Sequence, residues 1–91
     1  MSRRLVQVFR SPRRGETYLY VDQARGLEDV PEALLLQFGP PEPVLSLLLT
    51  PERRLARVRA AEVLEAIAAR GYFLQLPPTP EELRRREAAD G

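Results

Sequence analysis

The sequence contains no cysteine, histidine, lysine, tryptophan or asparagine. Without cysteine the chain has no disulfide, no thiolate nucleophile and no zinc–sulfur site, and this absence fits a reducing compartment. Without histidine it lacks the commonest transition-metal ligand and the usual general base near neutral pH. Without lysine it has neither a Schiff base nor a P-loop. We therefore expect no catalytic residue, no cofactor and no metal, and a protein that is not an enzyme.

Long hydrophobic runs are also missing. The longest is Val44–Leu49, which Ser46 interrupts, whereas a membrane-spanning helix needs about 20 apolar residues. The N-terminus carries arginines and then alternating residues rather than the apolar segment of a signal peptide. We expect a cytoplasmic protein without a membrane segment.

The chain is short and rich in charge. Its 91 residues predict one domain with a small core over residues 5–83 and a frayed tail over 84–91. The 14 basic side chains, all arginine, nearly balance 13 acidic ones, for a net charge of +1. Residues 1–15 carry arginines and no acid, so local basic patches are expected. The strongly basic field typical of nucleic-acid-binding domains is absent.

Four segments have the composition of β-strands: 5–9, 17–21, 44–49 and 72–76. The first two are separated by a turn, 11–15, in which Gly15 allows a positive φ, so they predict an antiparallel hairpin. The third is a short apolar run between Pro43 and Pro51, and these boundaries favour a buried strand over a helix.

Three segments predict helices. In 31–38, Pro31 suits the first helical position, Leu34, Leu35 and Phe38 share a face, and Gly39 suits the end. A third helix begins after Thr79, which forms a capping box with Glu82. The segment 60–70 ends at a glycine and has one apolar stripe: Ala60, Val63, Leu64, Ile67 and Ala68.

The order strand, strand, helix, strand, helix, strand, helix predicts an α+β fold. We expect a single small two-layer domain in which a four-stranded sheet carries its helices mainly on one face. If the third and fourth strands are neighbours, a right-handed crossover through 60–70 makes them parallel and the sheet mixed. Otherwise the sheet is antiparallel.

Several motifs occur together in one order and spacing: Phe9–Ser11, Thr17–Val21, Val30–Pro31, Phe38–Pro41, Arg54–Ala56 and Gly71–Pro78. In this they resemble the YcgL family of small bacterial proteins, over residues 5–83. The resemblance implies a small cytoplasmic α/β domain, and it carries over no activity, cofactor or catalytic residue. In one respect the sequence departs from the family, where relatives often have aspartate, a good helix N-cap, at the position of Arg59. The second long helix therefore begins either at Ala60 or earlier, near Arg53.

Tyr18 and Tyr20 are the first candidates for a binding site. Strand alternation puts them on the face opposite Leu19 and Val21. If Leu19 and Val21 face the helices, the tyrosines line an open sheet face, where aromatic rings can stack bases while guanidinium groups hold phosphates. The structural alternative is cross-strand packing beside a solvated turn. The hairpin supplies three arginines to this hypothesis: Arg10, Arg13 and Arg14.

The segment 72–76 is the second candidate. Alternation sends Tyr72, Leu74 and Leu76 to one face, and Phe73 and Gln75 to the other, where they extend the tyrosine face. The structural alternative is a strand that the prolines after Leu76 simply end and protect.

Two charged clusters complete the candidates. The run 53–59, if helical, puts Arg53 and Arg57, with Arg54 beside them, on one face that can contact phosphate or an acidic partner. The structural alternative, which the nearby glutamates favour, is ordinary solvated charge. Glu28, Asp29 and Glu32 carry oxygen ligands suited to a hard cation, but the dipole of the following helix accounts for them without a metal.

The sequence thus predicts a binding or accessory module that docks a protein partner through the aromatic sheet face. The alternative is a module that binds single-stranded RNA through Tyr18, Tyr20 and the hairpin arginines. The sequence sets neither the strand order nor the oligomeric state. The expected binding face consists of Arg10, Arg13, Arg14, Tyr18, Tyr20, Tyr72, Phe73 and Gln75.

Overall fold

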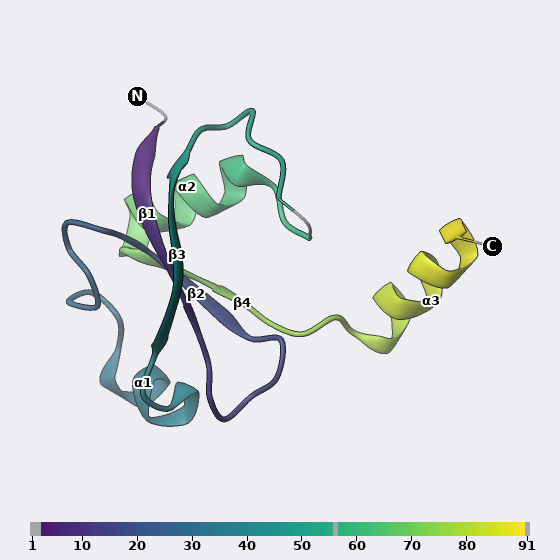
Figure 1. The fold of residues 1–91 in the computed structure, drawn as a ribbon, viewed down its shortest axis with the longest axis horizontal. Helices are drawn as coiled ribbons and strands as arrows, with labels where there is room; N and C mark the ends of the chain where they lie inside the picture. Colours follow the sequence, from purple (N-terminus) through teal and green to yellow (C-terminus); the bar gives the residue numbers. More distant parts are fainter. Residues whose placement is uncertain (1–2, 56, 91) are drawn as a thin grey trace.

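The computed structural model describes residues 3–55 and 57–90, with side chains as far as Arg85. The elements follow the predicted order: β1 (Arg4–Arg10), β2 (Tyr18–Asp22), α1 (Glu32–Phe38), β3 (Glu42–Leu49), α2 (Ala60–Arg70), β4 (Tyr72–Gln75) and α3 (Pro80–Asp90). The strands form one antiparallel sheet in the order β3-β1-β2-β4 (Figure 1). The α+β class is confirmed. The sheet is not mixed, because β3 and β4 lie at opposite edges.

The predicted hairpin joins β1 to β2. Its turn is held by the buried Ser11 hydroxyl, which donates to the Phe38 carbonyl at 2.6 Å and accepts from the backbone N–H of Arg13 and Arg14. The left-handed residue of this turn is Glu16, with a φ of 52°, and not Gly15 as the sequence suggested. The same hydroxyl therefore orders the hairpin and ties it to the end of α1.

α1 and the loop before it cover one face of the sheet. Leu19 and Val21 of β2 are buried there against Val30 and Phe38, with Leu34 and Leu35 packed at the margin. The predicted apolar face of α1 is confirmed. The helix ends where the Gly39 N–H donates to the Leu35 carbonyl at 3.0 Å, and the φ of 84° at Gly39 is one that other residues rarely adopt.

α2 covers the other face. Its buried residues Ala60, Val63, Leu64 and Ile67 confirm the predicted stripe, but Ala68 is exposed. They pack on Val6, Val8 and Tyr20. The structure therefore differs from the expected arrangement with helices mainly on one face, because α1 and α2 pack against opposite faces. α2 begins at Ala60 without a side-chain cap from Arg59, so the earlier start near Arg53 is wrong.

β3 is a strand, as predicted, but it is not buried. It pairs with β1 alone and forms one edge of the sheet. Only Leu49 is fully buried, whereas Val44, Leu45 and Leu48 are 46%, 48% and 47% exposed. Leu5, opposite Leu48 on β1, is 50% exposed. Composition indicated burial, but the position at the edge of the sheet decides exposure.

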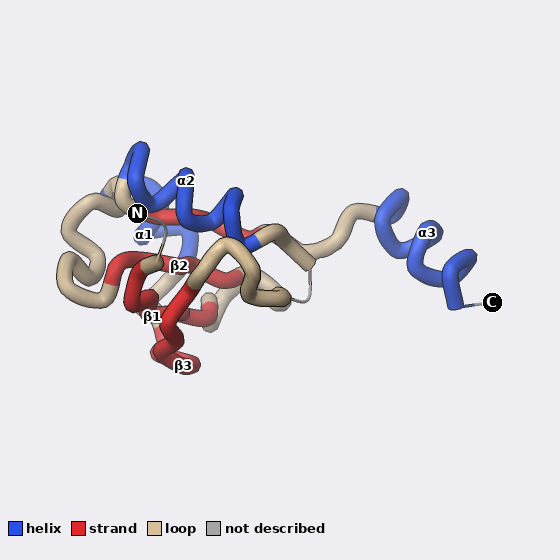
Figure 2. Tube along the Cα trace, turned by 90° about the horizontal axis from the view of Figure 1, so that it is seen from above, coloured by secondary structure: helices blue, strands red, loops and turns tan. Residues whose placement is uncertain are grey.

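α3 extends away from the rest of the chain (Figure 2). The predicted capping box is confirmed, because the Glu82 N–H donates to the Thr79 hydroxyl at 3.1 Å and the Thr79 N–H donates to the Glu82 carboxylate at 3.2 Å. The helix continues to Asp90, through the segment expected to fray. In the described ranges no helix has the length and apolarity needed to cross a membrane.

One ion pair links the far ends of β1 and β2. The Arg4 guanidinium donates to the Asp22 carboxylate at 2.8 Å, and the side chains are 35% and 19% exposed. The hydrogen bond from Arg4 holds the pKa of Asp22 below its usual value. Asp22 also accepts from the Ala24 N–H at 2.8 Å and so shapes the loop that follows β2.

The first prediction concerns the pH dependence of stability. The folded-state pKa of Asp22 is lowered. The ionised carboxylate therefore contributes fully to the free energy of unfolding above the unfolded-state pKa of about 3.9, and this contribution is lost as the pH falls through the folded-state pKa. We expect Asp22→Asn, which keeps an acceptor for Ala24, to lower the free energy of unfolding at pH 7 by about 0.5–1 kcal/mol. Urea unfolding measures the difference in the free energy of unfolding between this variant and the unmodified chain, and the difference should vanish at acid pH. A difference that stays constant down to pH 2 contradicts the stabilising role of the Arg4–Asp22 ion pair.

The second prediction concerns Gly71, which ends α2 with a φ of 92°. A Cβ there lies 2.3 Å from the Asp29 Cβ, whereas a Cβ at Gly15 meets nothing within 4 Å. We expect Gly71→Ala to lower the free energy of unfolding by about 1–2 kcal/mol from the left-handed backbone, plus the cost of moving Asp29. Gly15→Ala is the matched control and should change it by less than about 0.5 kcal/mol. Equal effects in urea unfolding refute this account.

Candidate functional site

The two tyrosines of β2 lie on the face that α2 covers. Tyr18 and Tyr20 point away from Leu19 and Val21, as alternation predicts. The expectation that this makes an open aromatic face is wrong, because Tyr20 is only 9% exposed and belongs to the core under α2. Leu19 and Val21 do face a helix, which is α1. The opposite face, which carries the tyrosines, is covered by α2.

Tyr20 makes two specific contacts with β4. Its ring meets the ring of Phe73 edge to face, at 5.9 Å between centroids and 73° between planes. Its hydroxyl donates to Oε1 of Gln75 at 2.9 Å. Burial, with a smaller effect from Tyr18, raises the pKa of Tyr20, and Arg57 partly offsets this. The predicted placement of Phe73 and Gln75 on the tyrosine face is therefore confirmed, as a packed cluster.

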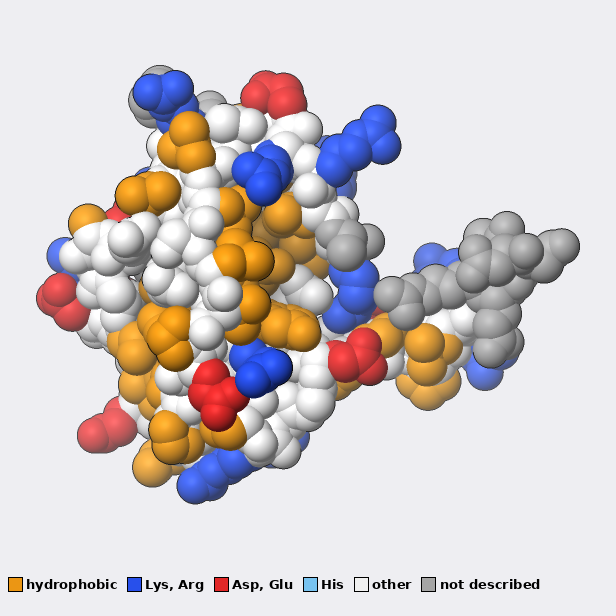
Figure 3. All heavy atoms as spheres, in the orientation of Figure 1, with side chains coloured by type: hydrophobic (Ala, Val, Ile, Leu, Met, Phe, Trp, Pro, Cys, Tyr) orange, Lys and Arg blue, Asp and Glu red, His pale blue; other side chains and the backbone are white. Residues whose placement is uncertain are grey.

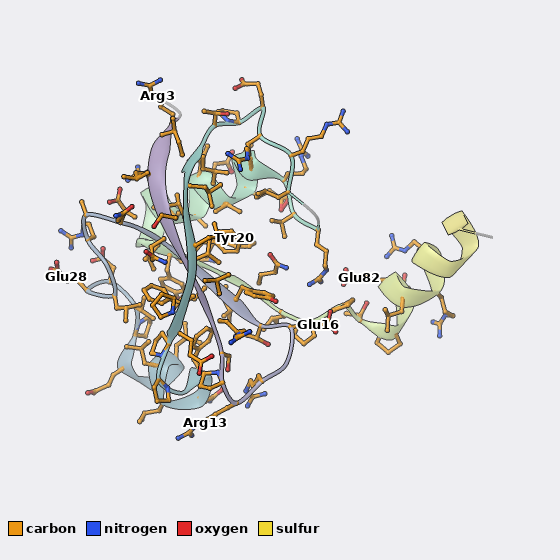
Figure 4. The ribbon with its side chains drawn as sticks, in the orientation of Figure 1. Arg3, Arg13, Glu16, Tyr20, Glu28 and Glu82 are labelled. Carbon is orange, nitrogen blue, oxygen red and sulfur yellow. The ribbon has the colours of Figure 1, made fainter. Side chains whose placement is uncertain are left out.

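Beside this cluster lies a groove of about 410 Å³. Its floor is apolar, and Figure 3 shows hydrophobic side chains gathered where Figure 1 places β3 and to one side of it. Figure 4 shows Tyr20 pointing into this region and Glu16 near the β1–β2 turn. The volume is at the lower end of the roughly 300–1,000 Å³ typical of small-ligand sites. The lining residues are Val8, Glu16, Tyr18, Tyr20, Val44, Leu45, Leu47, Arg53, Arg54, Leu55, Arg57 and Gln75.

The basic wall of the groove is a loop, here called the arginine loop (residues 50–55 and 57–59). It is not helical, as one interpretation of the run 53–59 required; Arg54 and Arg59 form an isolated β-bridge. Arg57 is largely buried and donates to the Leu76 carbonyl at 2.7 Å and to Glu82 at 3.3 Å. Among the described residues, Arg53 and Arg54 take part in no salt bridge. Arg57 therefore fixes the loop, and two exposed arginines face solvent beside the groove.

The groove has opposite charges at its two ends. Glu16 lies at one end, two residues before Tyr18, which pairs with Arg10 at the end of β1. Arg53 is at the other end, where its Nη1 lies 3.5 Å from the Leu48 carbonyl. The Thr79 N–H and Arg57 lower the pKa of Glu82, so the nearby carboxylate stays ionised and holds Arg57 in place. A ligand thus meets the Glu16 carboxylate at one end, apolar side chains in the middle and the Arg53 guanidinium at the other end. Arg57 lies beside Gln75 at the Glu16 end, where it is already paired with Glu82.

The remaining predicted residues do not join this site. Arg10 pairs with Glu42 at 3.1 Å. Arg13 donates to the Leu36 carbonyl at 3.2 Å, at the end of α1 and away from Tyr20 (Figure 4). Arg14 is exposed on the turn. Tyr72 lies on the α1 face, with the Arg70 guanidinium 5.1 Å above its ring.

Of the eight predicted face residues, the structure places Tyr18, Tyr20 and Gln75 in the groove, with Phe73 packed behind Tyr20. The sequence-based face omitted the apolar floor from β3 and the arginines at 53 and 54. The run 53–59 is a basic cluster in the sequence, but its position beside Tyr18 depends on the path of the chain after β3. No local sequence pattern indicates that path.

In the acidic cluster, Asp29 forms an ion pair. Asp29 pairs with Arg25 at 2.8 Å, which holds the pKa of Asp29 low and raises that of Arg25. No group of three or more metal-ligating side chains occurs in the part of the chain that the structure describes. The groove likewise has no serine or threonine among its described lining residues. Its chemistry is suited to binding apolar and anionic groups.

Comparison with known proteins places this fold in a family. The YcgL domain profile matches residues 6–78. A YcgL domain-containing protein of Chromohalobacter salexigens is 58% identical over 81 residues, which cover 89% of this chain and 84% of the relative. One from Pseudomonas aeruginosa is 55% identical over 80 residues, 88% of this chain and 82% of the relative. One from Pseudomonas putida is 49% identical over 92 residues, 92% of this chain and 95% of the relative. The chain belongs to the YcgL domain family.

Proposed function

We propose that this chain is a non-enzymatic docking module whose groove binds a short segment of a partner protein. The segment carries a large apolar side chain next to one or more carboxylates. The observation that supports this most directly is the apolar groove floor beside Arg53 and Arg54. The proposal places the protein at work in the cytoplasm.

The apolar floor supplies the affinity. Leu45 is nearly half exposed, and Val8 and Leu47 lie deeper beside it. Covering such surface gains about 25 cal/mol for each Å² of apolar area removed from water. Tyr18 is half-buried and lines the groove, so it offers a rigid aromatic wall.

The arginines supply the selectivity. A guanidinium group binds a carboxylate through two parallel hydrogen bonds, which fixes the orientation of the ligand. Because Arg53 lies at the Leu48 end of the groove and Glu16 at the other end, an acidic residue of the ligand belongs at the Leu48 end. A basic flank at that end is repelled.

Single-stranded RNA would use the same arginines. Its bases, however, need open aromatic faces for stacking. The rings of Phe73 and Tyr20 pack against each other beneath α2, so among the aromatic residues that line the groove Tyr18 is the one with a partly exposed ring. This arrangement favours a protein segment, and the experiment below includes RNA as a competing outcome.

The third prediction tests the groove with defined probes. The ¹⁵N-labelled chain is titrated with a peptide in which leucine is flanked by glutamates, with the same peptide carrying lysines, and with oligouridine. We expect the acidic peptide to shift the amide signals of Tyr18, Leu45 and Gln75, and the basic peptide to have no effect. Arg53→Glu together with Arg54→Glu should weaken binding about tenfold or more.

The matched control is Arg84→Glu together with Arg85→Glu, which makes the same charge change on exposed side chains of α3. It should leave binding unchanged. Equal binding of both peptides, or shifts outside the groove, contradicts the proposal. Binding of oligouridine alone, with an affinity that falls steeply as salt is added, supports the RNA alternative instead.

A further inference from the structure

We propose that β3 pairs with β3 of a second copy of the chain, so that the sheet continues through a two-fold axis into an eight-stranded sheet. The proposal rests on the outer edge of β3 and not on the groove's ligand. It therefore stands or falls separately from the docking function.

The outer edge of β3 has unused backbone groups. The Leu5 carbonyl accepts from Gln23 at 2.9 Å and the Ser11 N–H donates to Thr17 at 3.0 Å, so the odd-numbered residues of β1 point their backbone groups toward β2. The even-numbered ones then point toward β3. Their partners there include Leu47, opposite Val6. The backbone groups of Ser46 and Leu48 consequently point outward, away from the sheet.

The edge is apolar where natural edge strands usually carry protection. Charged residues, proline or a covering element normally block pairing with another chain. Here Glu42 and Pro43 stand at the beginning and Pro51 follows the end, but the stretch between them carries aliphatic side chains and one serine. In the part of the chain that the structure describes, the one side chain that donates to the Leu48 carbonyl is Arg53, at 3.5 Å, and this side chain is exposed. Long, apolar and unpaired edges of this kind are templates for strand addition.

The alternation of the strand limits the register. Between Leu45 and Leu49 the outward-facing residues are Ser46 and Leu48, so an antiparallel pair must match even with even there. Before Leu45 a register shift breaks this alternation, and Glu42, opposite Arg10, has its backbone groups toward β1. Centring on Ser46 places Val44 opposite Leu48 of the second copy, which covers two side chains that are each nearly half exposed. The register centred on Ser46 therefore pairs the outward backbone groups of Ser46 with each other and covers Leu48 of both copies.

Charge complementarity favours a second copy of this chain as the occupant. At the beginning of β3, Glu42 pairs with Arg10 at 3.1 Å but its side chain stays 47% exposed, and the arginine loop that follows the end of β3 is basic through Arg53 and Arg54. A two-fold axis turns one strand end for end, so the exposed Glu42 carboxylate of each copy comes next to the basic loop of the other copy. The same symmetry brings Leu45 of one copy opposite Leu47 of the other on the α2 face, so the two grooves become neighbours.

Analytical ultracentrifugation of the whole chain over a wide concentration range tests this directly. We expect a monomer–dimer equilibrium. Ser46→Pro removes the outward N–H without touching the pairing with β1 and should raise the dimer dissociation constant about tenfold or more. Ser46→Ala keeps this N–H but also loses the hydroxyl that donates to Gln7, so it is the matched control and should still dimerise.

A second pair of variants tests the same edge without proline, in case Ser46→Pro prevents the chain from folding. Leu48→Lys places a charge at the edge and should give a folded monomer, whereas Leu36→Lys changes the most exposed leucine, at 70%, on α1 and should leave the dimer intact. A chain that stays monomeric at every concentration overturns the proposal. So does a dimer that survives both Ser46→Pro and Leu48→Lys.

Discussion

Each face of the four-stranded sheet is covered by a single helix, α1 on one face and α2 on the other, and neither helix covers the middle of β3. α2 packs on Val6, Val8 and Tyr20, while α1 and the loop before it pack on Leu19 and Val21. The central strand β2 is consequently buried on both faces, and the edge strand β3 keeps aliphatic side chains in solvent. The groove and the exposed aliphatic edge both exist because neither helix packs on the middle of β3.

Local signals predicted the elements well, because a helix cap or a strand is encoded within a few residues. The capping box of Thr79 and Glu82 and the stop at Gly39 are of this kind. Strand order and the choice of covered face depend on contacts distant in sequence, which a pattern of alternation does not contain. Strand alternation predicts correctly to which face of the sheet Tyr20 points, but the burial of its ring depends on the packing of α2.

The candidate site shows the same division. Tyr18 and Gln75 were found because they alternate on strands, and the structure sets them opposite each other. Arg13 was expected to hold phosphate, but the contact of Ser11 with the end of α1 brings Arg13 to the Leu36 carbonyl. Arg53 reaches the groove because the chain turns back over the sheet after β3. The chemistry of each residue was readable from the sequence, whereas its neighbours were set by the tertiary fold.

The central claim is that β3 is an ordered edge strand whose outer side is uncovered in a single chain. Amide hydrogen exchange in dilute solution, at concentrations where the chain is monomeric, tests it most directly. The account predicts alternation, with slow exchange at Leu47, which faces β1, and fast exchange at Ser46 and Leu48, which face outward. Equal protection of all three amides, or equally fast exchange along the whole of β3, contradicts it.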